Sequence, residues 1–447
     1  MSRPTPLSGY PELLPAERNA ELAILDRLRR IFELHGYANV ETRAVEPLER
    51  LLSKGEIDKE VYVLRRLQAG SDASDSGVGL HYDLTVPFAR YILENSGRLE
   101  FPFRRYQIQK AWRGERPQEG RFREFTQADI DVVGRDELPP HFDVEIAQVI
   151  VEALGALPIP AVRLQVNNRK LIEGFYRGVG ASDPAAVMQI IDKLDKLSPD
   201  DIATMLTSIG LTREQAQQCL ALAEIRAVDT SFVATVRRLG VEHPLLDVGL
   251  DELAAVLDGC APLTTDRCEV VADLRIARGL DYYTGTVFET RMLGMESLGS
   301  ICSGGRYDAL ATDGSTTYPG VGISLGVSRT LVPLFQRGLL SSSRSVPSAV
   351  LVALADESTR STSDALAGQL RARGIACEVA ASPQKYGKQI RYAERRGIPF
   401  VWFPATDDKP HQVKDIRSGA QVDADPDGWR PSDEDLRPQV TTKEQIP

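Results

Sequence analysis

The sequence contains few of the residues that build disulfide frameworks and metal sites. Among its 447 residues are five cysteines and five histidines, and none of them stands in a CxxC, HxxxH or HExxH spacing. An odd number of scattered cysteines argues against a set of disulfides and favours a reducing compartment such as the cytoplasm. We therefore expect no metal site built from a cluster of protein ligands.

Long apolar runs and an excess of basic residues are also absent. No stretch approaches the ~18 apolar residues that span a bilayer, and the first residues lack the basic-then-apolar pattern of a signal peptide. Lys and Arg number 53 against 63 Asp and Glu, which gives a net charge of −10. A net negative charge does not attract nucleic acid, so any contact with nucleic acid requires local basic patches. We expect a cytoplasmic protein with no membrane contact.

Apolar periodicity predicts the elements of the first part of the chain. A helix is expected over 17–36 and a strand over 40–42. Strands over 103–113 and 122–133 are joined by a connection short enough for antiparallel pairing. Short helices with few strand signals over about 183–257 predict a helical insertion.

A composition change marks a second domain. Three serines and a proline follow Gly338 and predict a linker, and beyond it strands and helices alternate, which predicts a small domain with a mostly parallel sheet. The last residues are rich in Asp and Pro and are predicted to be disordered. The expected divisions are a first domain over 1–337, a linker over 338–347, a second domain over 348–424 and a disordered tail over 425–447.

The predicted strand over 122–133 has two different faces, because side chains alternate along a strand. The face that suits a core carries Thr126, Ala128, Ile130 and Val132. The other face carries Arg123, Phe125, Gln127, Asp129 and Asp131. Such a polar face is commonly solvated, since antiparallel sheets often face water on one side.

Arginines gather where the two strands of this hairpin are joined. Arg113, Arg116, Arg121 and Arg123 lie there together with Glu115. Guanidinium groups this close repel one another unless an anion lies between them, and their planar forks match phosphate oxygens. The pattern favours a polyphosphate at this end of the hairpin and a cation or hydrogen-bond donor beside the carboxylates deeper on the strand.

Four further segments make the function specific. They are HYDLTVP at 81–87, RGLDYYTG at 278–285, SGGRYD at 303–308 and GVGISLGVSR at 320–329. With the hairpin, and in this order, they resemble the histidyl-tRNA synthetase family of class II aminoacyl-tRNA synthetases. The hairpin resembles motif 2 of that class and the end of the last segment its motif 3, and the resemblance runs from about residue 10 to residue 416.

The resemblance implies an α+β fold, with an antiparallel sheet flanked by helices, a helical insertion and a C-terminal α/β domain that binds the anticodon. It implies that L-histidine reacts with ATP to give histidyl-adenylate, and that the histidyl group then passes to tRNA(His), releasing AMP and diphosphate. It also implies a homodimer, and Mg²⁺ that is bound with ATP between the β- and γ-phosphates.

The resemblance assigns the arginines of the site. Arg113 and Glu115 match the residues that hold the α-phosphate and adenine of ATP, and Arg113 also has a catalytic role. Arg121 and Arg329 match arginines that hold the outer phosphates, with Arg329 against the adenine ring. Arg278 matches the family's catalytic arginine, which contacts the α-phosphate where other class II enzymes use a metal ion.

The histidine pocket is implied in the same way. Two residues match positions that receive the α-amino group, two match polar side chains of the pocket, and two form an aromatic pair that closes on the imidazole. In that order they are Asp83 and Thr85, Gln127 and Asp131, and Tyr282 and Tyr283, with Arg278 beside them.

One predicted helix of the second domain carries a basic stripe. Lys385, Lys388, Arg391 and Arg395 recur at intervals of three or four residues. A solvated helix face and a contact with the RNA backbone are both open interpretations. The aromatic residues Tyr386, Tyr392 and Trp402 are candidates for stacking on bases, although core packing suits Trp402 better.

The sequence departs from the family at three positions. Arg43 stands in the motif 1 segment where the class usually has proline, Ser328 stands where an acidic residue is common, and Ser303 replaces a smaller residue.

The main alternative is a catalytically inactive, synthetase-like regulatory subunit that senses histidine. Such relatives typically lack the anticodon-binding domain and lose active-site arginines, whereas this chain keeps Arg113, Arg121, Arg278 and Arg329. A class II synthetase for another amino acid is a third interpretation. It would require the resemblance of RGLDYYTG to the family's histidine-specific signature to be accidental.

Overall fold

The computed structural model describes residues 4–52, 60–67, 77–276 and 283–443. These residues form two compact units, one of Met1–Pro11 and Arg27–Pro333 and the other of Glu12–Asp26 and Leu334–Pro447. We call them the first and the second unit and describe each by itself. Among the described residues, no helix is long and apolar enough to cross a membrane.

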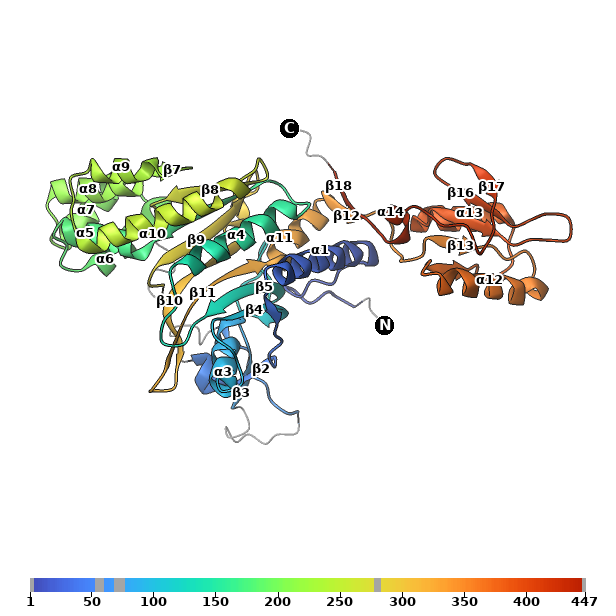
Figure 1. Ribbon diagram of the computed structural model, residues 1–447, viewed down its shortest axis with the longest axis horizontal. Helices are drawn as coiled ribbons and strands as arrows, with labels where there is room; N and C mark the ends of the chain where they lie inside the picture. The colour runs from blue at the N-terminus through green and yellow to red at the C-terminus, as the bar shows by residue number, and fades with distance from the viewer. Residues whose placement is uncertain (1–3, 53–59, 68–76, 277–282, 444–447) are drawn as a thin grey trace. The chain divides into compact units, whose positions relative to one another are not determined.

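A nine-stranded sheet with the order β1-β4-β5-β11-β10-β9-β6-β8-β7 is the centre of the first unit (Figure 1). The strands from β4 across to β6 pair antiparallel, while β1–β4 and β6–β8 pair parallel. The strands are β1 Ala38–Asn39, β4 Phe103–Trp112, β5 Glu124–Val133, β6 Val162–Asn168, β7 Arg226–Ala227, β8 Cys268–Asp273, β9 Thr286–Met292, β10 Cys302–Thr312 and β11 Thr317–Gly326. The predicted antiparallel hairpin is confirmed as β4 and β5.

The predicted strand over 40–42 is wrong. Strand β1 ends at Asn39, and β2 (Val45–Pro47) pairs with β3 (Val78–Leu80) in a separate two-stranded sheet. The backbone N–H of Val40 still donates to the carbonyl of Tyr106 at 2.9 Å, so the chain follows β4 for one more residue and then turns to the second sheet.

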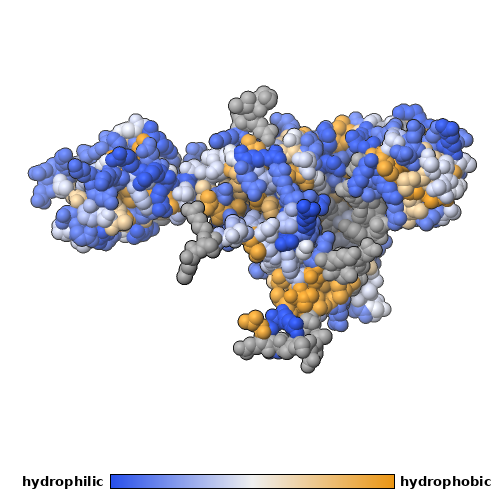
Figure 2. Space-filling model, turned by 180° about the vertical axis from the view of Figure 1, so that it is seen from behind, coloured by the Kyte–Doolittle hydropathy of each residue, from blue (hydrophilic) through white to orange (hydrophobic). Residues whose placement is uncertain are grey.

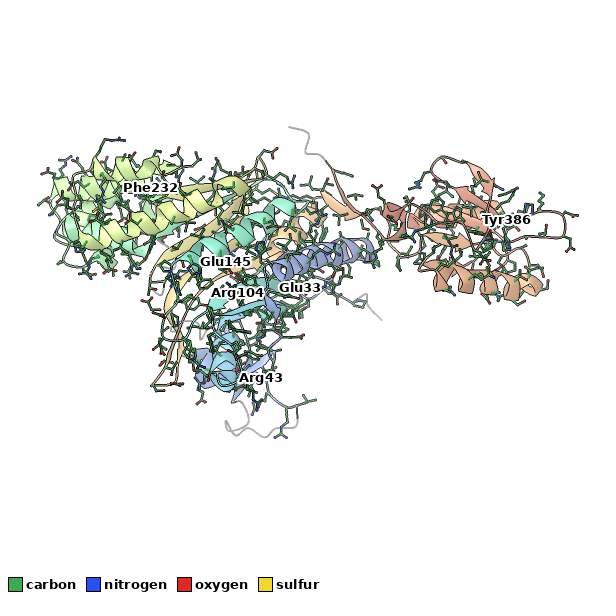
Figure 3. All side chains as sticks on the ribbon, viewed as in Figure 1. Glu33, Arg43, Arg104, Glu145, Phe232 and Tyr386 are labelled. Atoms are coloured by element: carbon green, nitrogen blue, oxygen red, sulfur yellow. The ribbon has the colours of Figure 1, made fainter. Side chains whose placement is uncertain are left out.

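Helices cover one face of the large sheet. Figure 1 shows α4 (His141–Ala156) and α10 (Pro244–Cys260) running along it, and α4 buries apolar residues such as Ile146 and Ile150 there. An ion pair of 2.6 Å between Arg104 Nε on β4 and Glu145 Oε1 ties α4 to the sheet (Figure 3). The opposite face of the sheet carries the polar residues described below.

The region predicted as a helical insertion consists mainly of short helices. Side-chain caps start several of them, as at Asp183, whose carboxylate accepts the N–H of Ala186, and at Thr212, which forms a capping box with Gln215. The helices there are α5 Arg169–Gly178, α6 Pro184–Ile191, α7 Pro199–Ser208, α8 Arg213–Ala223 and α9 Ser231–Arg237, followed by α10. Their buried residues include Phe232, labelled in Figure 3.

The remaining helices of the first unit begin or end beside the polar face. They are α2 Leu48–Leu51, α3 Thr85–Asn95 and α11 Val327–Gln336, the last of which runs into the second unit. The long first helix, α1 Pro15–Leu34, agrees with the predicted helix over 17–36, and Gly36 follows it at φ 79°.

In the second unit, a five-stranded sheet has the order β14-β13-β15-β16-β17. Val350 and Val352 of β13 join the core on the side of α12, whereas Leu351 joins the core on the side of α13. The prediction of a mostly parallel sheet holds for β14, β13 and β15, and two antiparallel strands that the sequence did not indicate extend it. The elements are β13 Val350–Val352, α12 Arg360–Ala372, β14 Cys377–Val379, α13 Tyr386–Arg396, β15 Phe400–Phe403, β16 Gln412–Asp415 and β17 Gln421–Asp423.

The prediction of a disordered tail over 425–447 is wrong for the described residues of that segment. The ring of Trp429 packs edge-on against Phe400 and Trp402, each with a centroid distance of 5.2 Å. The tail then forms α14 (Asp433–Leu436) and β18 (Val440–Thr442), which pairs with β12 (Leu340–Ser342). The packing of one aromatic residue and the pairing of one strand therefore order a segment whose composition resembles that of a linker. The partner strand β12 lies within the predicted linker over 338–347.

The arginine of the SGGRYD segment, Arg306, forms buried contacts between β10 and other parts of the first unit. Arg306 on β10 is only 7% exposed, and its Nε donates to Asp143 Oδ1 of α4 at 2.8 Å. Its other nitrogens donate to the carbonyls of Leu138 and Pro139, and Thr286 donates to the second oxygen of Asp143 at 2.6 Å. This part of the sequence motif is therefore structural.

We predict that Arg306→Met lowers the free energy of unfolding of the first unit by about 3–5 kcal/mol, because the Asp143 carboxylate is left buried without its partner. The control is Arg163→Met, which breaks the more exposed 2.6 Å pair with Glu269 and should cost less than about 1 kcal/mol. Urea titration measures both. Equal losses in the two variants would contradict the structural role of Arg306.

Candidate active site

The polar face of β5 is buried. Gln127, Asp129 and Asp131 are 8%, 2% and 5% exposed, and Ala128 and Ile130 on the opposite face are buried as well. The interpretation of this face as solvated is therefore wrong. Buried polar groups require partners, so the contacts of these three side chains indicate the role of this face.

The neighbouring strands continue the polar face in two rows. Residues paired across antiparallel strands point to the same side of the sheet. The register places Gln107, Asp129, Ser324 and Ser303 in one row across β4, β5, β11 and β10. The second row consists of Arg105, Asp131, Gly322 and Gly305 on the same four strands.

Asp131 lies between a buried guanidinium and a phenol. Nη2 of Arg105, which is fully buried, is 2.7 Å from Asp131 Oδ2 and 4.0 Å from Asp129 Oδ2. The Arg105 guanidinium also stacks over the ring of Phe88 at 4.2 Å. The hydroxyl of Tyr307 donates to Asp131 Oδ1 at 2.8 Å. Both oxygens of Asp131 are thus held, and the carboxylate has a fixed orientation.

Two glycines of the 320–329 segment make room for this arrangement. A Cβ atom added at Gly322 would lie 2.0 Å from Asp131 Oδ1, and one added at Gly320 would lie 2.4 Å from Cε2 of Tyr307. Both distances are impossible for real side chains. The glycine-rich sequence of β11 is therefore required because the side chains of Asp131 and Tyr307 lie across that strand.

Asp129 takes part in a chain of short hydrogen bonds. The Ser324 hydroxyl donates to Asp129 Oδ1 at 2.5 Å, and Gln127 Nε2 donates to Ser324 Oγ at 2.6 Å. Burial raises the pKa of Asp129 to about 7, the charge of Asp131 adds to the rise, and the charge of Arg105 opposes it. Asp129 therefore changes its charge near neutral pH.

Three arginines converge at the other end of the site. Burial and the charges of Arg121 and Arg113 lower the pKa of Arg329, and the nearby Glu115 offsets them in part. Glu115 Oε2 lies 3.6 Å from Arg121 Nη1, and the guanidinium of Arg113 lies over the ring of Phe125 at 5.1 Å. Guanidinium groups that converge in this way suit the oxygens of a polyphosphate, which would neutralise their mutual repulsion.

Two adjoining cavities connect the arginines with the carboxylates. They share a common wall. The shared wall is lined by Glu60, Asp83, Thr85, Arg113, Asp129, Tyr283, Ser303 and Ser324. The first cavity continues to Glu115, Arg121, Phe125, Gln127 and Arg329. The second continues to Tyr82, Asp131, Tyr307 and Gly322.

The structure thus brings together most of the residues that the sequence singles out, from motifs more than 200 positions apart. Arg116 and Arg123 do not line either cavity: Arg116 is exposed, and Arg123 donates to the carbonyl of Glu115 at 3.3 Å. Arg278 and Tyr282 lie outside the described residues.

Sequence reasoning missed several residues that line the site. The alternation of β5 placed Asp129 on one face with Gln127 and Asp131, but it was assigned no role of its own in the site. Ser324 lies inside the glycine-rich segment, but its contact with Asp129 depends on the pairing of β5 with β11. Tyr307 belongs to the SGGRYD segment but was given no role of its own, and Glu60 carried no signal that sets it apart from surface residues.

Two of the departures from the family have a structural explanation. Ser328 is buried, and its Oγ accepts the backbone N–H of Thr126 at 2.8 Å, which fixes the start of α11 against β5. Arg43 lies 3.7 Å from Glu46 and 3.5 Å from Glu94, within a set of ion pairs that includes the buried Arg90 (Figure 3).

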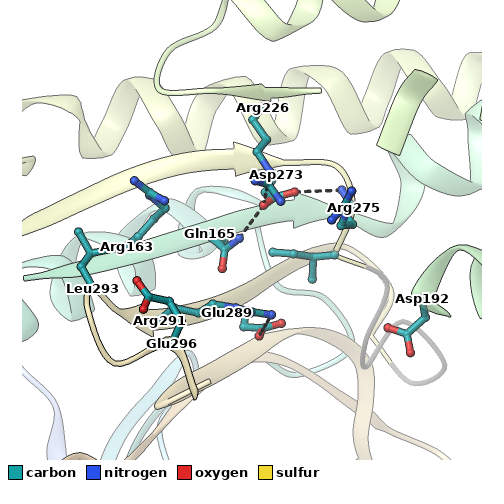
Figure 4. Close-up of a pocket in the computed structure, with 11 residues that line it drawn as sticks. Arg163, Gln165, Asp192, Arg226, Asp273, Arg275, Glu289, Arg291, Leu293 and Glu296 are labelled. Carbon is teal, nitrogen blue, oxygen red and sulfur yellow. Dashed lines mark hydrogen bonds and ion pairs between the residues drawn. The ribbon is translucent and has the colours of Figure 1, made fainter. Parts of the chain in front are cut away.

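Another cavity of the first unit has a different character (Figure 4). Arg226 lies 2.9 Å from Asp273, which also accepts a hydrogen bond from Gln165 at 2.6 Å, and Arg291 lies 3.3 Å from Glu289. The arginines and carboxylates that line it are equal in number: Arg163, Arg226, Arg275 and Arg291, against Asp192, Asp273, Glu289 and Glu296. Its formal charges cancel, and its arginines alternate with carboxylates instead of gathering at one end.

The basic stripe of the second unit lies on α13. Lys388, Arg391 and Arg395 are exposed and line a shallow cavity beside the ends of β13 and β14. Lys385 is exposed at the N-cap of the helix and does not line it. Tyr386 is 39% exposed (Figure 3), whereas Trp402 is fully buried, so its predicted place in the core is confirmed.

A largely antiparallel sheet that carries a cluster of arginines beside a cavity with buried carboxylates is the arrangement of a class II aminoacyl-tRNA synthetase. Comparison with known proteins agrees. The family model of histidyl-tRNA synthetase matches residues 9–330, and that of the anticodon-binding domain matches residues 348–424. The chain belongs to the histidyl-tRNA synthetase family.

Individual relatives match over nearly their whole length. The histidine–tRNA ligases of Cutibacterium acnes and Micrococcus luteus are each 57% identical to this chain, over 98% of it and 99% of their own length. The crystal structure of histidyl-tRNA synthetase from Nostoc sp. PCC 7120 superimposes with a TM-score of 0.83 at 35% identity, covering 94% of this chain and 96% of that one.

Proposed function

We propose that this protein activates L-histidine with ATP to form histidyl-adenylate and diphosphate, and then transfers the histidyl group to tRNA(His) with release of AMP. The observation that carries the proposal is the pair of adjoining cavities, one ending in arginines and the other in buried carboxylates, with a shared wall where the two substrates would meet.

ATP would occupy the first cavity. Its triphosphate supplies the negative charge that the Arg113, Arg121 and Arg329 cluster lacks, and burial strengthens each of these interactions. Arg329 would lie against the adenine ring, with Glu115 as a hydrogen-bond acceptor for the base. Burial lowers the pKa of Arg329, the charges of Arg121 and Arg113 lower it further, and a bound anion would relieve this repulsion.

Histidine would occupy the second cavity. Its ammonium group suits the acceptors Asp83 and Thr85 of the shared wall and Gln127, which lines the adjoining first cavity. Its imidazole suits Asp131, with Tyr283 and Tyr282 closing over the ring. A cavity with fixed buried hydrogen-bonding groups rejects amino acids that leave those groups unpaired. Specificity for histidine follows from the rigid orientation of Asp131 between Arg105 and Tyr307.

The first reaction step requires alignment and charge neutralisation. The histidine carboxylate is already an anion at neutral pH, so it attacks the α-phosphorus without a protein base, and diphosphate leaves with the electron pair of the broken P–O bond. Negative charge that develops on the α-phosphate would be neutralised by Arg113 and Arg278. This explains a site rich in arginine in which no cysteine or histidine side chain acts as nucleophile.

Mg²⁺ enters the proposal only as part of the ATP complex. The described residues contain no group of three side chains that could hold a metal ion, so the described side chains do not fit a metal site of their own. Phosphate oxygens would supply most of the ligands of Mg²⁺.

The exposed basic stripe of α13 is the proposed contact for the tRNA backbone, and Tyr386 beside it is available to stack on a base. Local positive charge of this kind is what an acidic protein requires in order to bind RNA. A cytoplasmic location completes the proposal, since the five free, buried cysteines suit a reducing compartment.

A regulatory subunit that only senses histidine is the alternative. A protein of that kind has no use for the arginine cluster of the first cavity or for an anticodon-binding domain, and this chain has both. The activity is therefore the better-supported proposal.

The experiment that tests the activity is exchange of labelled diphosphate into ATP by the purified protein. We expect exchange when histidine is supplied and none with the other amino acids, because only histidine completes the second cavity. If the protein binds histidine but gives no exchange, the regulatory alternative is correct.

We predict that Gly322→Ala weakens histidine binding about tenfold or more, because the added Cβ displaces the Asp131 carboxylate from its position between Arg105 and Tyr307. ATP affinity should change by less than about threefold, since the arginine cluster is not disturbed. Calorimetry measures both, with Gly368→Ala, which meets nothing within 4 Å, as the control. Unchanged histidine affinity in Gly322→Ala would show that Asp131 does not define the pocket.

A homodimer is proposed on the apolar surface of the first unit. Figure 2 shows hydrophobic residues gathered over the region of α3, β2 and β3. Large apolar side chains are exposed in the neighbouring segment, and clustered exposure of this kind marks protein interfaces. They are Leu52, Val63, Leu64, Leu67 and Val78.

We predict that Val63→Asp converts the dimer to monomers, because a carboxylate buried in an apolar interface has no partner. The control is Val248→Asp on α10, which is 45% exposed against 52% for Val63 and lies outside this surface. Sedimentation velocity distinguishes the two. A dimer that survives Val63→Asp would place the interface elsewhere.

A further inference from the structure

The chain of hydrogen bonds from Gln127 through Ser324 to Asp129 has a direction. A carboxylate only accepts hydrogen bonds, and a serine hydroxyl has a single hydrogen to donate. Because that hydrogen is directed to Asp129 Oδ1 at 2.5 Å, Ser324 Oγ can only accept from Gln127, and the group of Gln127 at 2.6 Å must be its NH₂. The charge of Asp129 therefore fixes which end of the Gln127 amide faces Ser324.

The other end of the amide belongs to a side chain that lines the first cavity. Gln127 Oε1 is buried and accepts no hydrogen bond from the described residues. The same cavity is lined by Asp83 and Glu60, whose carboxylates are further hydrogen-bond acceptors. A ligand group that carries several N–H donors and a positive charge would satisfy these acceptors.

We propose that Asp129 and Ser324 are positioning residues, which hold the Gln127 carbonyl oxygen toward the cavity to accept a hydrogen bond from the ammonium group of the amino-acid substrate. The inference rests on the proposed histidine activation and identifies residues that determine how tightly the amino acid binds. Asp129 acts through Ser324 and does not itself touch the substrate.

The reversed amide would oppose binding. If the NH₂ group of Gln127 faced the cavity, two N–H donors would point at an ammonium group, which is a repulsive arrangement. Without Ser324 the amide has no partner that selects between its two orientations, and the Asp129 carboxylate loses a hydrogen bond in a buried position.

Protonation of Asp129 would reverse the chain. A neutral Asp129 can donate its own proton to Ser324, whose hydroxyl then turns to Gln127 and favours the reversed amide. The charged and titratable groups around Asp129 are Arg105 on β4, Asp131 on β5, Asp83 before α3 and Cys302 on β10. The carboxylate is charged above its pKa of about 7, so binding of the amino acid should weaken as the pH falls below neutrality.

The first test is Ser324→Ala in histidine-dependent diphosphate exchange. The KM for histidine should rise about tenfold, because the variant loses one buried hydrogen bond and with it the fixed orientation of the Gln127 amide. The kcat and the KM for ATP should stay within about twofold of those of the unmodified protein. Ser324→Thr keeps the hydroxyl and should restore the histidine KM. The control is Ser363→Ala in α12, which removes a buried serine bond of 3.0 Å to the Ala353 carbonyl without touching the site.

The second test is the pH profile of Asp129→Asn, which has no carboxylate to titrate. Between pH 8 and pH 6 the histidine KM of the unmodified protein should rise about tenfold more than that of the variant, as expected for a carboxyl of pKa about 7. Protonation of free histidine affects both proteins equally and cancels in the ratio.

The outcomes separate the two proposals. If the unmodified protein shows no histidine-dependent exchange, the proposed function fails. If it does exchange, but Ser324→Ala keeps the histidine KM and only lowers the melting temperature, Ser324 is merely structural and the inference is overturned. Parallel pH profiles of the unmodified protein and Asp129→Asn would overturn the role of Asp129.

Discussion

Two carboxylates and one guanidinium are buried side by side in the middle of the central sheet, and the rest of the site is arranged around them. Arg105 is fully buried, so its charge needs Asp131 at 2.7 Å and Asp129 at 4.0 Å. One positive charge cannot neutralise two negative ones. The remainder is balanced by donors from Tyr307 and Ser324 and, in the proposed complex, by the polar groups of the substrate.

The site is polarised from one end to the other. The guanidinium groups of Arg121 and Arg329 line only the first cavity and the carboxylate of Asp131 only the second, while Arg113 and Asp129 lie in the shared wall. A molecule with three phosphates and a molecule with an ammonium group are drawn to opposite ends of this field. Their reacting groups, the α-phosphate and the carboxylate, would then meet at the shared wall. The arrangement of charge thus supplies much of the alignment that adenylate formation requires.

Alternation along β5 was enough to predict the hairpin and its polar face, because a period of two depends only on neighbouring residues. Whether that face is buried could not be predicted, since β11 and β10, which complete it, lie about 190 positions further along the chain. The resemblance named residues such as Asp83 and Arg329 but not Ser324, whose role depends on one cross-strand contact. The tail after residue 424 shows the same limit, because its order depends on where a single residue, Trp429, can pack.

The most direct test of the central claim is a crystal structure with histidine and a non-hydrolysable ATP analogue bound together. We expect the triphosphate among Arg113, Arg121 and Arg329, the imidazole hydrogen-bonded to Asp131, and the histidine carboxylate facing the α-phosphorus beside the shared wall. A triphosphate bound away from these arginines, or an imidazole that does not reach Asp131, would contradict it.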